Sequence, residues 1–285
     1  MTRHALLEQT AARLEGAGIE DARRNAEWLL EEVLGASRAA LYAHPEAPVS
    51  TGEALHVEAL TARRIRREPL QYVLGHADFF GLRLRVTPAV LIPRPETEEV
   101  AEEALRHLEG REAPWVLDVG TGSGALALAL KHRRPDAEVF ACDVSEAALA
   151  VAADNAERLG LAVAFVQADV LDPAFVHAAP PSFDLVVSNP PYVPEAERAT
   201  LAPEVRDHEP PEALFVPSAD PLLFYRVLAA RAPDLLRPGG ALVVETHADH
   251  GGAVRDLFAG AGLEGAALRR DLAGRPRIVS AHLPA

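Results

Sequence analysis

The sequence feature that most constrains the fold is a cluster of glycines set between an apolar strand and a helix. Residues 115–119 are an apolar run of strand length, Gly120-Thr121-Gly122-Ser123-Gly124 follows at once, and residues 125–131 continue as a helix. Glycines let a ligand approach the backbone closely and leave amide donors at the start of the next helix. The stretch therefore predicts a strand–loop–helix unit that binds a nucleotide-like ligand.

Two further apolar runs extend this unit to a βαβαβ order, which is typical of an α/β fold. Residues 139–142 lead into Asp143, residues 163–166 lead toward Asp169, and a helical stretch over 145–159 separates the two runs. Asp143 lies about twenty residues past the glycines, where a ribose diol is usually bound. Asp169 is placed to accept a hydrogen bond from an adenine amine. The alternatives are a helix cap for Asp143 and a turn for Asp169, and we favour the ligand interpretation for both.

A fourth apolar run, over residues 183–188, stops at Asn189, Pro190, Pro191 and Tyr192. Two consecutive prolines remove two backbone donors, so the strand must end and Asn189 must lie at its carboxyl end. The Asn189 side-chain carbonyl and the Pro190 backbone carbonyl can each accept a hydrogen bond from a planar NH₂ group, and Tyr192 offers a ring for stacking. The alternative is a proline-rich turn without a ligand.

The predicted chemistry is methyl transfer to that planar nitrogen. An amide nitrogen is a poor nucleophile because its lone pair is delocalised, so holding both protons and directing the lone pair at an electrophile is what a catalyst can add. The third glycine comes too early for the Gly-x-Gly-x-x-Gly pattern of dinucleotide oxidoreductases, and no hydride-transfer constellation is evident. An adenosine cofactor with a transferable methyl group, S-adenosylmethionine, fits better.

Composition argues against several other functions. The net charge of −14 suits a basic protein partner better than unaided nucleic acid. A single cysteine and the absence of metal spacing among the histidines argue against a disulfide or a metal site. No apolar run is long enough to span a membrane and no signal peptide is evident. We therefore expect a cytoplasmic enzyme with no metal, no membrane contact and no direct nucleic-acid partner.

The first 75 residues are predicted to be a small helical domain. Asp21 is expected to cap one helix that ends at Gly35, and Ser50 with Glu53 to form a capping box for another. The second helix finishes in four arginines, which we interpret as a solvated helix end rather than a binding face: Arg63, Arg64, Arg66 and Arg67. Residues 76–90 then predict a β-hairpin that turns at Gly81 and links to residues 91–285.

The remaining segments complete the predicted sheet. Arg94 and Thr97, before a helix over 98–108, are interpreted as turn chemistry rather than ligand contacts. Residues 193–218 show no clear periodicity and are interpreted as a wall or lid, and His208 within them as surface rather than a general base. Asp220 is expected to cap a helix through residue 235. A strand over 241–245, a helix over 248–261 and a final hairpin around Gly274 follow.

Taken together, these motifs resemble those of the release factor glutamine methyltransferases, and the resemblance extends along nearly the whole chain. The matching stretches are residues 68–72, 91–97, 118–124, 188–192, 209–214 and 271–275. The Asn-Pro-Pro-Tyr motif is shared with adenine and cytosine amino-methyltransferases, whereas the Pro93-Arg94-Pro95 segment, the loop and the tail together are more specific. The resemblance implies a Rossmann-like class I methyltransferase domain with a mixed, mainly parallel seven-stranded sheet.

The family's activity implies that the substrate is the glutamine of the Gly-Gly-Gln motif in peptide chain release factors, methylated on N5, with S-adenosylhomocysteine as the second product. The substrate cradle would comprise Asn189, Pro190, Pro191 and Tyr192, with Asn189, Pro190 and Tyr192 acting in catalysis. The implied cofactor contacts are Gly120, Thr121, Gly122, Ser123, Gly124, Asp143, Asp169, Val170 and Asn189. Val170 departs from the family, because some relatives carry an aromatic residue there. The alternative functions are an amino-methyltransferase that acts on adenine or cytosine of nucleic acid and a binding module without turnover.

Overall fold

The computed structural model describes residues 1–175 and 182–285 and divides the chain into two compact units. The first unit contains residues 1–76 together with a later segment, residues 202–208. The second unit contains residues 77–201 and 209–285. The chain therefore leaves the second unit after residue 201 and returns to it at Glu209, which the sequence did not predict.

The first unit is helical, as predicted. Its helices are α1 (Arg3–Gly16), α2 (Ala22–Leu34), α3 (Arg38–Ala43), α4 (Thr51–Ile65), α5 (Leu70–Leu74) and α10 (Pro203–His208). Its core is apolar and fully buried at Leu14, Leu29, Leu30 and Val57. Ser50 and Glu53 form the predicted capping box of α4. The cap predicted at Asp21 is wrong, because Asp21 adopts a left-handed backbone with φ of 48° and its side chain makes no capping hydrogen bond.

Three of the four arginines at the end of α4 make hydrogen bonds inside the first unit: Arg63, Arg64 and Arg67. The prediction of a solvated helix end is therefore wrong for these three. Arg63 donates to the carbonyls of Tyr72 and Val73 at 2.9 and 3.1 Å. Arg64 is buried, and both Arg64 and Arg67 donate to one carboxylate oxygen of Glu204, at 3.0 and 3.3 Å. Long guanidinium groups reach carboxylates and free carbonyls beyond their own helix, which helix periodicity cannot reveal.

The predicted hairpin opens the second unit. It pairs β1 (His76–Phe79) with β2 (Leu82–Arg85). The two turn residues, Phe80 and Gly81, have φ of 52° and 80°. Two left-handed residues in a two-residue loop match the right-handed twist of the flanking strands, which explains why a glycine marks this turn.

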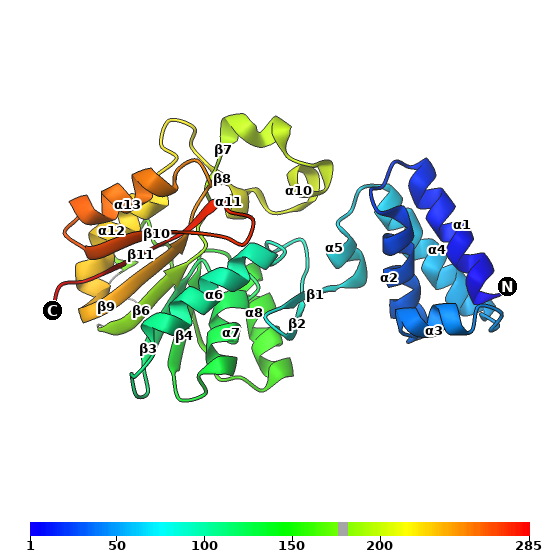
Figure 1. Ribbon diagram of the computed structural model, residues 1–285, viewed down its shortest axis with the longest axis horizontal. Helices are drawn as coiled ribbons and strands as arrows, with labels where there is room; N and C mark the ends of the chain where they lie inside the picture. Colours follow the sequence, from blue (N-terminus) through cyan, green and yellow to red (C-terminus); the bar gives the residue numbers. More distant parts are fainter. Residues whose placement is uncertain (176–181) are drawn as a thin grey trace. The chain divides into compact units, whose positions relative to one another are not determined.

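The predicted sheet is confirmed: seven strands lie in the order β10-β11-β9-β6-β3-β4-β5 (Figure 1). All neighbouring pairs are parallel except β10 with β11 and β11 with β9. The strands are β3 (Trp115–Val119), β4 (Glu138–Asp143), β5 (Ala164–Gln167), β6 (Phe183–Ser188), β9 (Leu236–Glu245), β10 (Glu264–Arg270) and β11 (Pro276–His282). Gly274, with φ of 78°, lies in the turn of the predicted terminal hairpin.

Helices cover both faces of this sheet, which is why its central strands are largely apolar. Along β6, Leu185 and Val187 belong to one core and Phe183 and Val186 to the other. The first core is closed by α6 (Pro95–His107), α7 (Ala125–Arg133) and α8 (Glu146–Leu159), and the second by α12 (Leu223–Leu235) and α13 (Gly251–Gly260). Figure 1 shows the resulting three layers.

The strand order reverses direction between β3 and β6. From β3 the chain runs outward to β4 and β5, and it then returns to β6 on the other side of β3. The final residues of these two parallel strands, Val119 and Ser188, are register partners, and the Ser188 hydroxyl donates to the Val119 carbonyl at 2.7 Å. Open α/β sheets bind ligands at such a switch point. The glycine loop and Asn189 both begin there.

The stretch after Tyr192 is more ordered than its sequence predicted. It contains a 3₁₀-helix (Glu195–Thr200), α10, α11 (Pro211–Leu214) and a two-stranded sheet of β7 (Val193–Pro194) and β8 (Phe215–Val216). These elements are too short to produce a periodic pattern. The cap predicted at Asp220 is also wrong: α12 has Leu222 at its N-cap, and the Asp220 carboxylate accepts from Arg226. None of the helices in the described ranges combines the length and apolar character of a membrane span.

Candidate active site

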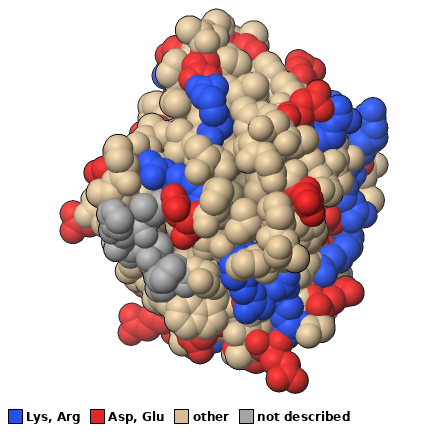
Figure 2. Space-filling model, turned by 90° about the vertical axis from the view of Figure 1, so that its left-hand side faces the viewer, with Lys and Arg blue, Asp and Glu red and all other residues tan. Residues whose placement is uncertain are grey.

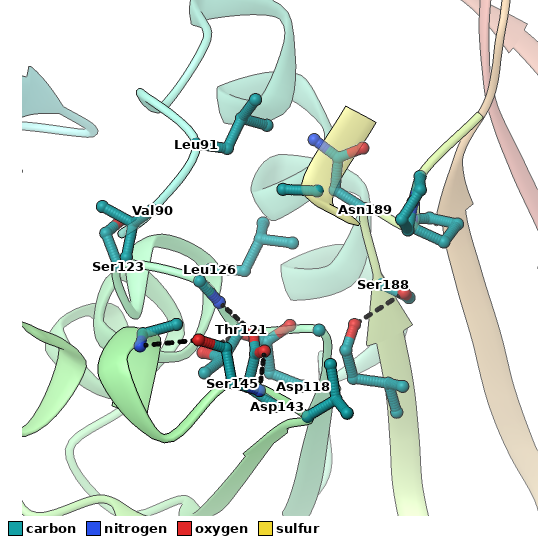
Figure 3. Close-up of a pocket in the computed structure, with 18 of the residues that line it drawn as sticks. Val90, Leu91, Asp118, Thr121, Ser123, Leu126, Asp143, Ser145, Ser188 and Asn189 are labelled. Carbon is teal, nitrogen blue, oxygen red and sulfur yellow. Dashed lines mark hydrogen bonds between the residues drawn. The ribbon is translucent and has the colours of Figure 1, made fainter. Parts of the chain in front are cut away.

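One pocket opens at the switch point, within the second unit. Its empty volume, open mouth included, is about 1110 Å³. Of the predicted site residues, it is lined by Gly120, Thr121, Gly122, Ser123, Asp143, Asp169, Val170, Asn189, Pro190 and Pro191. Figure 3 shows Asp118, Thr121 and Asp143 gathered on one side and Asn189 on another. Gly124 and Tyr192 are not part of the lining.

The glycine loop is held by the end of the neighbouring strand β4. The amides of Gly120 and Thr121 donate to the Cys142 carbonyl at 2.9 and 3.0 Å, and the Gly122 amide donates to the Asp143 carboxylate at 2.9 Å. Gly120 and Gly122 have φ of 74° and 56°, a left-handed backbone that favours glycine. The loop is therefore preorganised around the pocket.

Gly124 supports the loop from behind. It has φ of 84°, and a Cβ at this position would lie 3.0 Å from Leu128 and 3.3 Å from Ala152. The absence of a side chain lets α7 begin close against α8. Gly124 therefore serves packing, although it belongs to the same run as the glycines that line the pocket.

Asp143 lines the pocket, and α8 is capped by the Ser145 side chain rather than by Asp143. One carboxylate oxygen accepts from Gly122 and the other accepts from the Ser145 amide at 2.9 Å, just before α8. Burial raises the pKa of the Asp143 carboxyl, and Glu212 across the pocket adds to that rise. Asp169 accepts from the Leu171 amide at 2.8 Å, which is turn chemistry, and it also lines the pocket.

Asp118 is a pocket residue that sequence reasoning missed. It is 1% exposed, and its Oδ2 accepts from the Thr121 hydroxyl at 2.7 Å and the Ala127 amide at 3.1 Å. Within the described residues its Oδ1 finds no hydrogen-bond donor. Burial raises the Asp118 pKa to about 7. An unpaired buried oxygen at a pocket wall is an acceptor for a positively charged ligand group.

Asn189 is anchored through its nitrogen. Its Nδ2 donates to the Thr97 hydroxyl at 3.2 Å, and Pro190 and Pro191 line the pocket beside it. Tyr192 is half-buried, packs against the second core and donates its hydroxyl to Glu245 at 3.1 Å. Burial raises the pKa of the Tyr192 hydroxyl well above its usual value, so that hydroxyl stays a donor.

Arg94 and Thr97 form the predicted turn, in which the Thr97 amide donates to the Arg94 carbonyl at 3.1 Å, and both residues also line the pocket, which the sequence did not predict. Thr97 is buried and contacts Asn189, as described above. Arg94 lines the pocket and pairs with Glu209, whose other oxygen accepts from the Ile92 amide at 3.1 Å. The segment that returns from the helical unit is thereby fixed to the pocket wall.

Arg231 holds the turn that carries Val170. Its guanidinium donates to the carbonyls of Val170 and Asp172 at 2.8 and 2.6 Å. Val170 is buried and lines the pocket, so this wall is formed by an aliphatic side chain on a turn that two hydrogen bonds to backbone carbonyls hold. His208 lies in α10 of the helical unit and does not line the pocket.

The fold and the pocket define a methyltransferase. A family model described as "Methyltransferase small domain" matches residues 99–205, and a methyltransferase crystal structure from Pyrococcus furiosus shares the fold, with a TM-score of 0.51 and 17% identity over 72% of this chain and 91% of that one. The model of the "PrmC N-terminal domain" matches residues 5–75.

Two curated relatives narrow the class. The release factor glutamine methyltransferase of Geobacter sulfurreducens is 41% identical over 98% of this chain and 95% of the relative. The protein of the same name from Chlorobaculum tepidum is 45% identical over 89% of this chain and 88% of the relative. The chain belongs to the release factor glutamine methyltransferase family, and the resemblance found in its sequence is confirmed.

Proposed function

We propose that this protein transfers a methyl group from S-adenosylmethionine to the side-chain nitrogen N5 of the glutamine in the Gly-Gly-Gln motif of peptide chain release factors, in the cytoplasm. The observation that carries the proposal is the register pairing of Val119 with Ser188. Because these strand ends are adjacent, the glycine loop and the Asn189-Pro190-Pro191 corner line one pocket. Cofactor and target amide would therefore meet there.

The pocket residues suit the proposed cofactor. S-adenosylmethionine supplies a methyl group on a positively charged sulfur, and it also carries an ammonium group. The unpaired Oδ1 of Asp118 is a suitable acceptor for that ammonium. Asp143 is placed for the ribose hydroxyls, and Asp169 and Val170 for the adenine. Gly120 to Ser123 let the cofactor approach the backbone closely.

The corner would hold the target amide. Asn189 presents a side-chain carbonyl because its nitrogen is used by Thr97, and the Pro190 carbonyl supplies a second acceptor. Two acceptors fix both amide protons and point the nitrogen lone pair away from the corner. Tyr192 would offer its ring to the amide plane. The proton lost after transfer can pass to water, so no strong base is required.

The helical unit is proposed to take part in recognising the release factor. It forms a compact unit of its own and corresponds to a separate family model over residues 5–75. Partly exposed aromatic side chains on it, Trp28 and Tyr42, are 38% and 48% exposed, and such side chains are common anchors in protein interfaces.

The alternative, methylation of adenine or cytosine in nucleic acid, fits less well. A net charge of −14 opposes approach to a phosphate backbone. Figure 2 shows one face of the molecule, on which acidic side chains lie beside the basic ones. A binding module without turnover is disfavoured because the glycine loop and the corner lie together in one pocket.

Methyl transfer from labelled S-adenosylmethionine to a release factor tests the proposal. The parent release factor should gain one methyl group on the peptide that contains Gly-Gly-Gln, and a matched variant with alanine in place of that glutamine should gain none. DNA and RNA oligonucleotides serve as competing substrates. Equal labelling of both release factors, or preferential labelling of nucleic acid, would refute the proposal.

A further inference from the structure

Behind the corner, one buried carboxylate connects the groups that would face the target amide. Glu245, at the end of β9, is 1% exposed. Its Oε2 accepts from the Thr97 hydroxyl at 2.6 Å, and its Oε1 accepts from the Tyr192 hydroxyl at 3.1 Å. Thr97 in turn accepts from Asn189 Nδ2 at 3.2 Å. The chain of hydrogen bonds therefore runs from a buried carboxyl group to the pocket.

The direction of each hydrogen bond in this chain follows from chemistry. Each oxygen of Glu245 accepts from one hydroxyl, Oε2 from Thr97 and Oε1 from Tyr192, which is how a carboxylate without a proton is paired. Thr97 has a single proton, and once that proton points at Glu245 the Thr97 oxygen can only accept. Asn189 must then turn its NH₂ group toward Thr97 and its carbonyl toward the pocket. Burial raises the pKa of the Glu245 carboxyl, and the Thr97 hydroxyl, the Arg277 guanidinium and the Tyr192 hydroxyl beside it oppose that rise. Arg277 is itself held by Asp271 at 3.2 Å.

We propose that Glu245, acting through Thr97, fixes the orientation of the Asn189 side-chain amide and so makes the pocket selective for an uncharged primary amide over a carboxylate. The inference rests on the proposed function and deepens it. A glutamine offers two N–H donors to the Asn189 carbonyl and the Pro190 carbonyl. A glutamate at the same position carries a carboxylate, which has no proton to donate. Its oxygens and the Asn189 and Pro190 carbonyls would all be acceptors, so none of them would find a partner. Glu245 and Thr97 are positioning residues, because neither is proposed to touch the reacting atoms.

Three variants separate positioning from simple support of the fold. Thr97→Val keeps the shape of the side chain and removes the hydroxyl, Thr97→Ser keeps the hydroxyl and is the matched control, and Glu245→Gln keeps the size and removes the charge. We expect Thr97→Val to lower kcat on the release factor by about ten- to hundredfold, with the Kd for S-adenosylmethionine changed less than about threefold. Thr97→Ser should restore kcat to near the parent value.

Glu245→Gln tests polarity directly. The new NH₂ group can donate to Thr97, so the threonine proton is free to point at Asn189 and the asparagine amide can reverse. The variant should then present a donor to the pocket. We expect a release factor with glutamate in place of the target glutamine to inhibit Glu245→Gln at least about tenfold more strongly than it inhibits the parent enzyme. If Glu245 only stabilised the fold, its replacement would not strengthen inhibition by the glutamate-containing release factor. Glu102→Gln, at an exposed position on α6, is the matched control.

A second measurement keeps this inference separate from the proposed function. The side-chain amide signals of Asn189 in a ¹⁵N-edited NMR spectrum, assigned by their loss in Asn189→Ala, should move in Glu245→Gln and in Thr97→Val and stay in place in Glu102→Gln. If the parent methylates the release factor but Thr97→Val matches it in kcat and Glu245→Gln matches it in inhibition, positioning by Glu245 is wrong and the function stands. If the parent does not methylate the release factor, the proposed function is wrong, and the NMR signals alone test whether Glu245 orients the Asn189 amide. Unmoved signals would then refute the orientation by Glu245, and moved signals would support it.

Discussion

Replacing Asp118 by asparagine should stabilise the cofactor-free protein and weaken its binding of cofactor. Asp118 is buried, and one of its oxygens lacks a donor within the described residues. Its pKa rises from 3.8 to about 7, and at about 1.4 kcal/mol per pKa unit ionisation at pH 7 costs roughly 4 kcal/mol of folding free energy. Asparagine removes this cost. The NH₂ group of the new asparagine then lacks an acceptor, which costs about 1–3 kcal/mol of folding free energy.

The expected net gain at pH 7 is therefore about 1–3 kcal/mol, seen as a rise in Tm of a few degrees. The sign of the pH dependence follows from the raised pKa. Between pH 4 and pH 7 the folded parent holds a proton that the unfolded chain has lost, so the parent loses stability as pH rises. At pH 5 the cost of ionisation is only about 1.6 kcal/mol. The stability gap between Asp118→Asn and the parent should therefore widen by about 2 kcal/mol from pH 5 to pH 7.

Cofactor binding should show the opposite effect. The parent needs an ionised Asp118 to accept the ammonium group, so its affinity for S-adenosylmethionine should strengthen between pH 6 and pH 8. The variant should bind at least about tenfold more weakly at pH 8, with little dependence on pH over this range. Urea unfolding and titration calorimetry measure the two quantities. A variant that is less stable than the parent at pH 7, or one that binds cofactor equally well, would refute the reasoning.

Other predictions follow from single contacts. Gly124→Ala should destabilise the fold by about 1–3 kcal/mol, because φ is 84° and the new Cβ meets Leu128 at 3.0 Å, whereas Gly252→Ala, in open space on α13, should be neutral or stabilising in the same urea titration. Asn189→Ala should lower kcat for methyl transfer by about a hundredfold with little change in cofactor Kd. Arg231→Lys should weaken cofactor binding by roughly fivefold in calorimetry, because lysine cannot hold the carbonyls of the Val170 turn together. Burial, with His107 and Arg111 nearby, lowers the pKa of His282. Because the unfolded chain then takes up a proton before the folded protein does, the folded protein loses stability as pH falls below about 6.5. His282→Gln should therefore lose less stability than the parent between pH 7.5 and pH 5.5.

Each of these has a clear contrary result. Equal stability of the two alanine variants would mean that the close approach of α7 and α8 does not depend on glycine. Turnover of Asn189→Ala within a few-fold of the parent would remove this residue from its proposed role. A cofactor affinity unaffected by Arg231→Lys would show that the Val170 turn holds without the guanidinium. An identical loss of stability on acidification in His282→Gln would place the pH-sensitive group elsewhere.

The sheet was predictable because its signals are local. Each parallel strand is an apolar run of a few residues, and the glycines and prolines that end two of those runs, after Val119 and Ser188, mark the strand ends directly. Since parallel strand ends meet at one edge, the approximate position of the pocket followed as well. Helix caps were less predictable. Ser50 and Asp21 both precede the first residue of a helix, but only Ser50 makes a capping hydrogen bond, because Asp21 has a left-handed backbone.

The polar contacts behind the pocket could not be predicted in this way. Thr97 and Glu245 are 148 residues apart, and Arg94 and Glu209 are 115 residues apart. Periodicity describes which face a residue occupies but not which distant residue it meets. Asp118 was hidden for another reason. It lies inside an apolar strand, and its importance is evident only from a carboxylate oxygen that the folded chain leaves unpaired.

The excursion of residues 202–208 into the helical unit limits how this protein can be rearranged. Glu204 is held by Arg64 and Arg67, while Glu209, only five positions later, is fixed to Ile92 and Arg94. The chain thus passes between the two units again, long after the hairpin that first joins them in sequence. Exchanging the amino-terminal helices for those of a distant homologue would leave an orphaned carboxylate unless the graft carried matching arginines, so we expect the two parts to have diverged together.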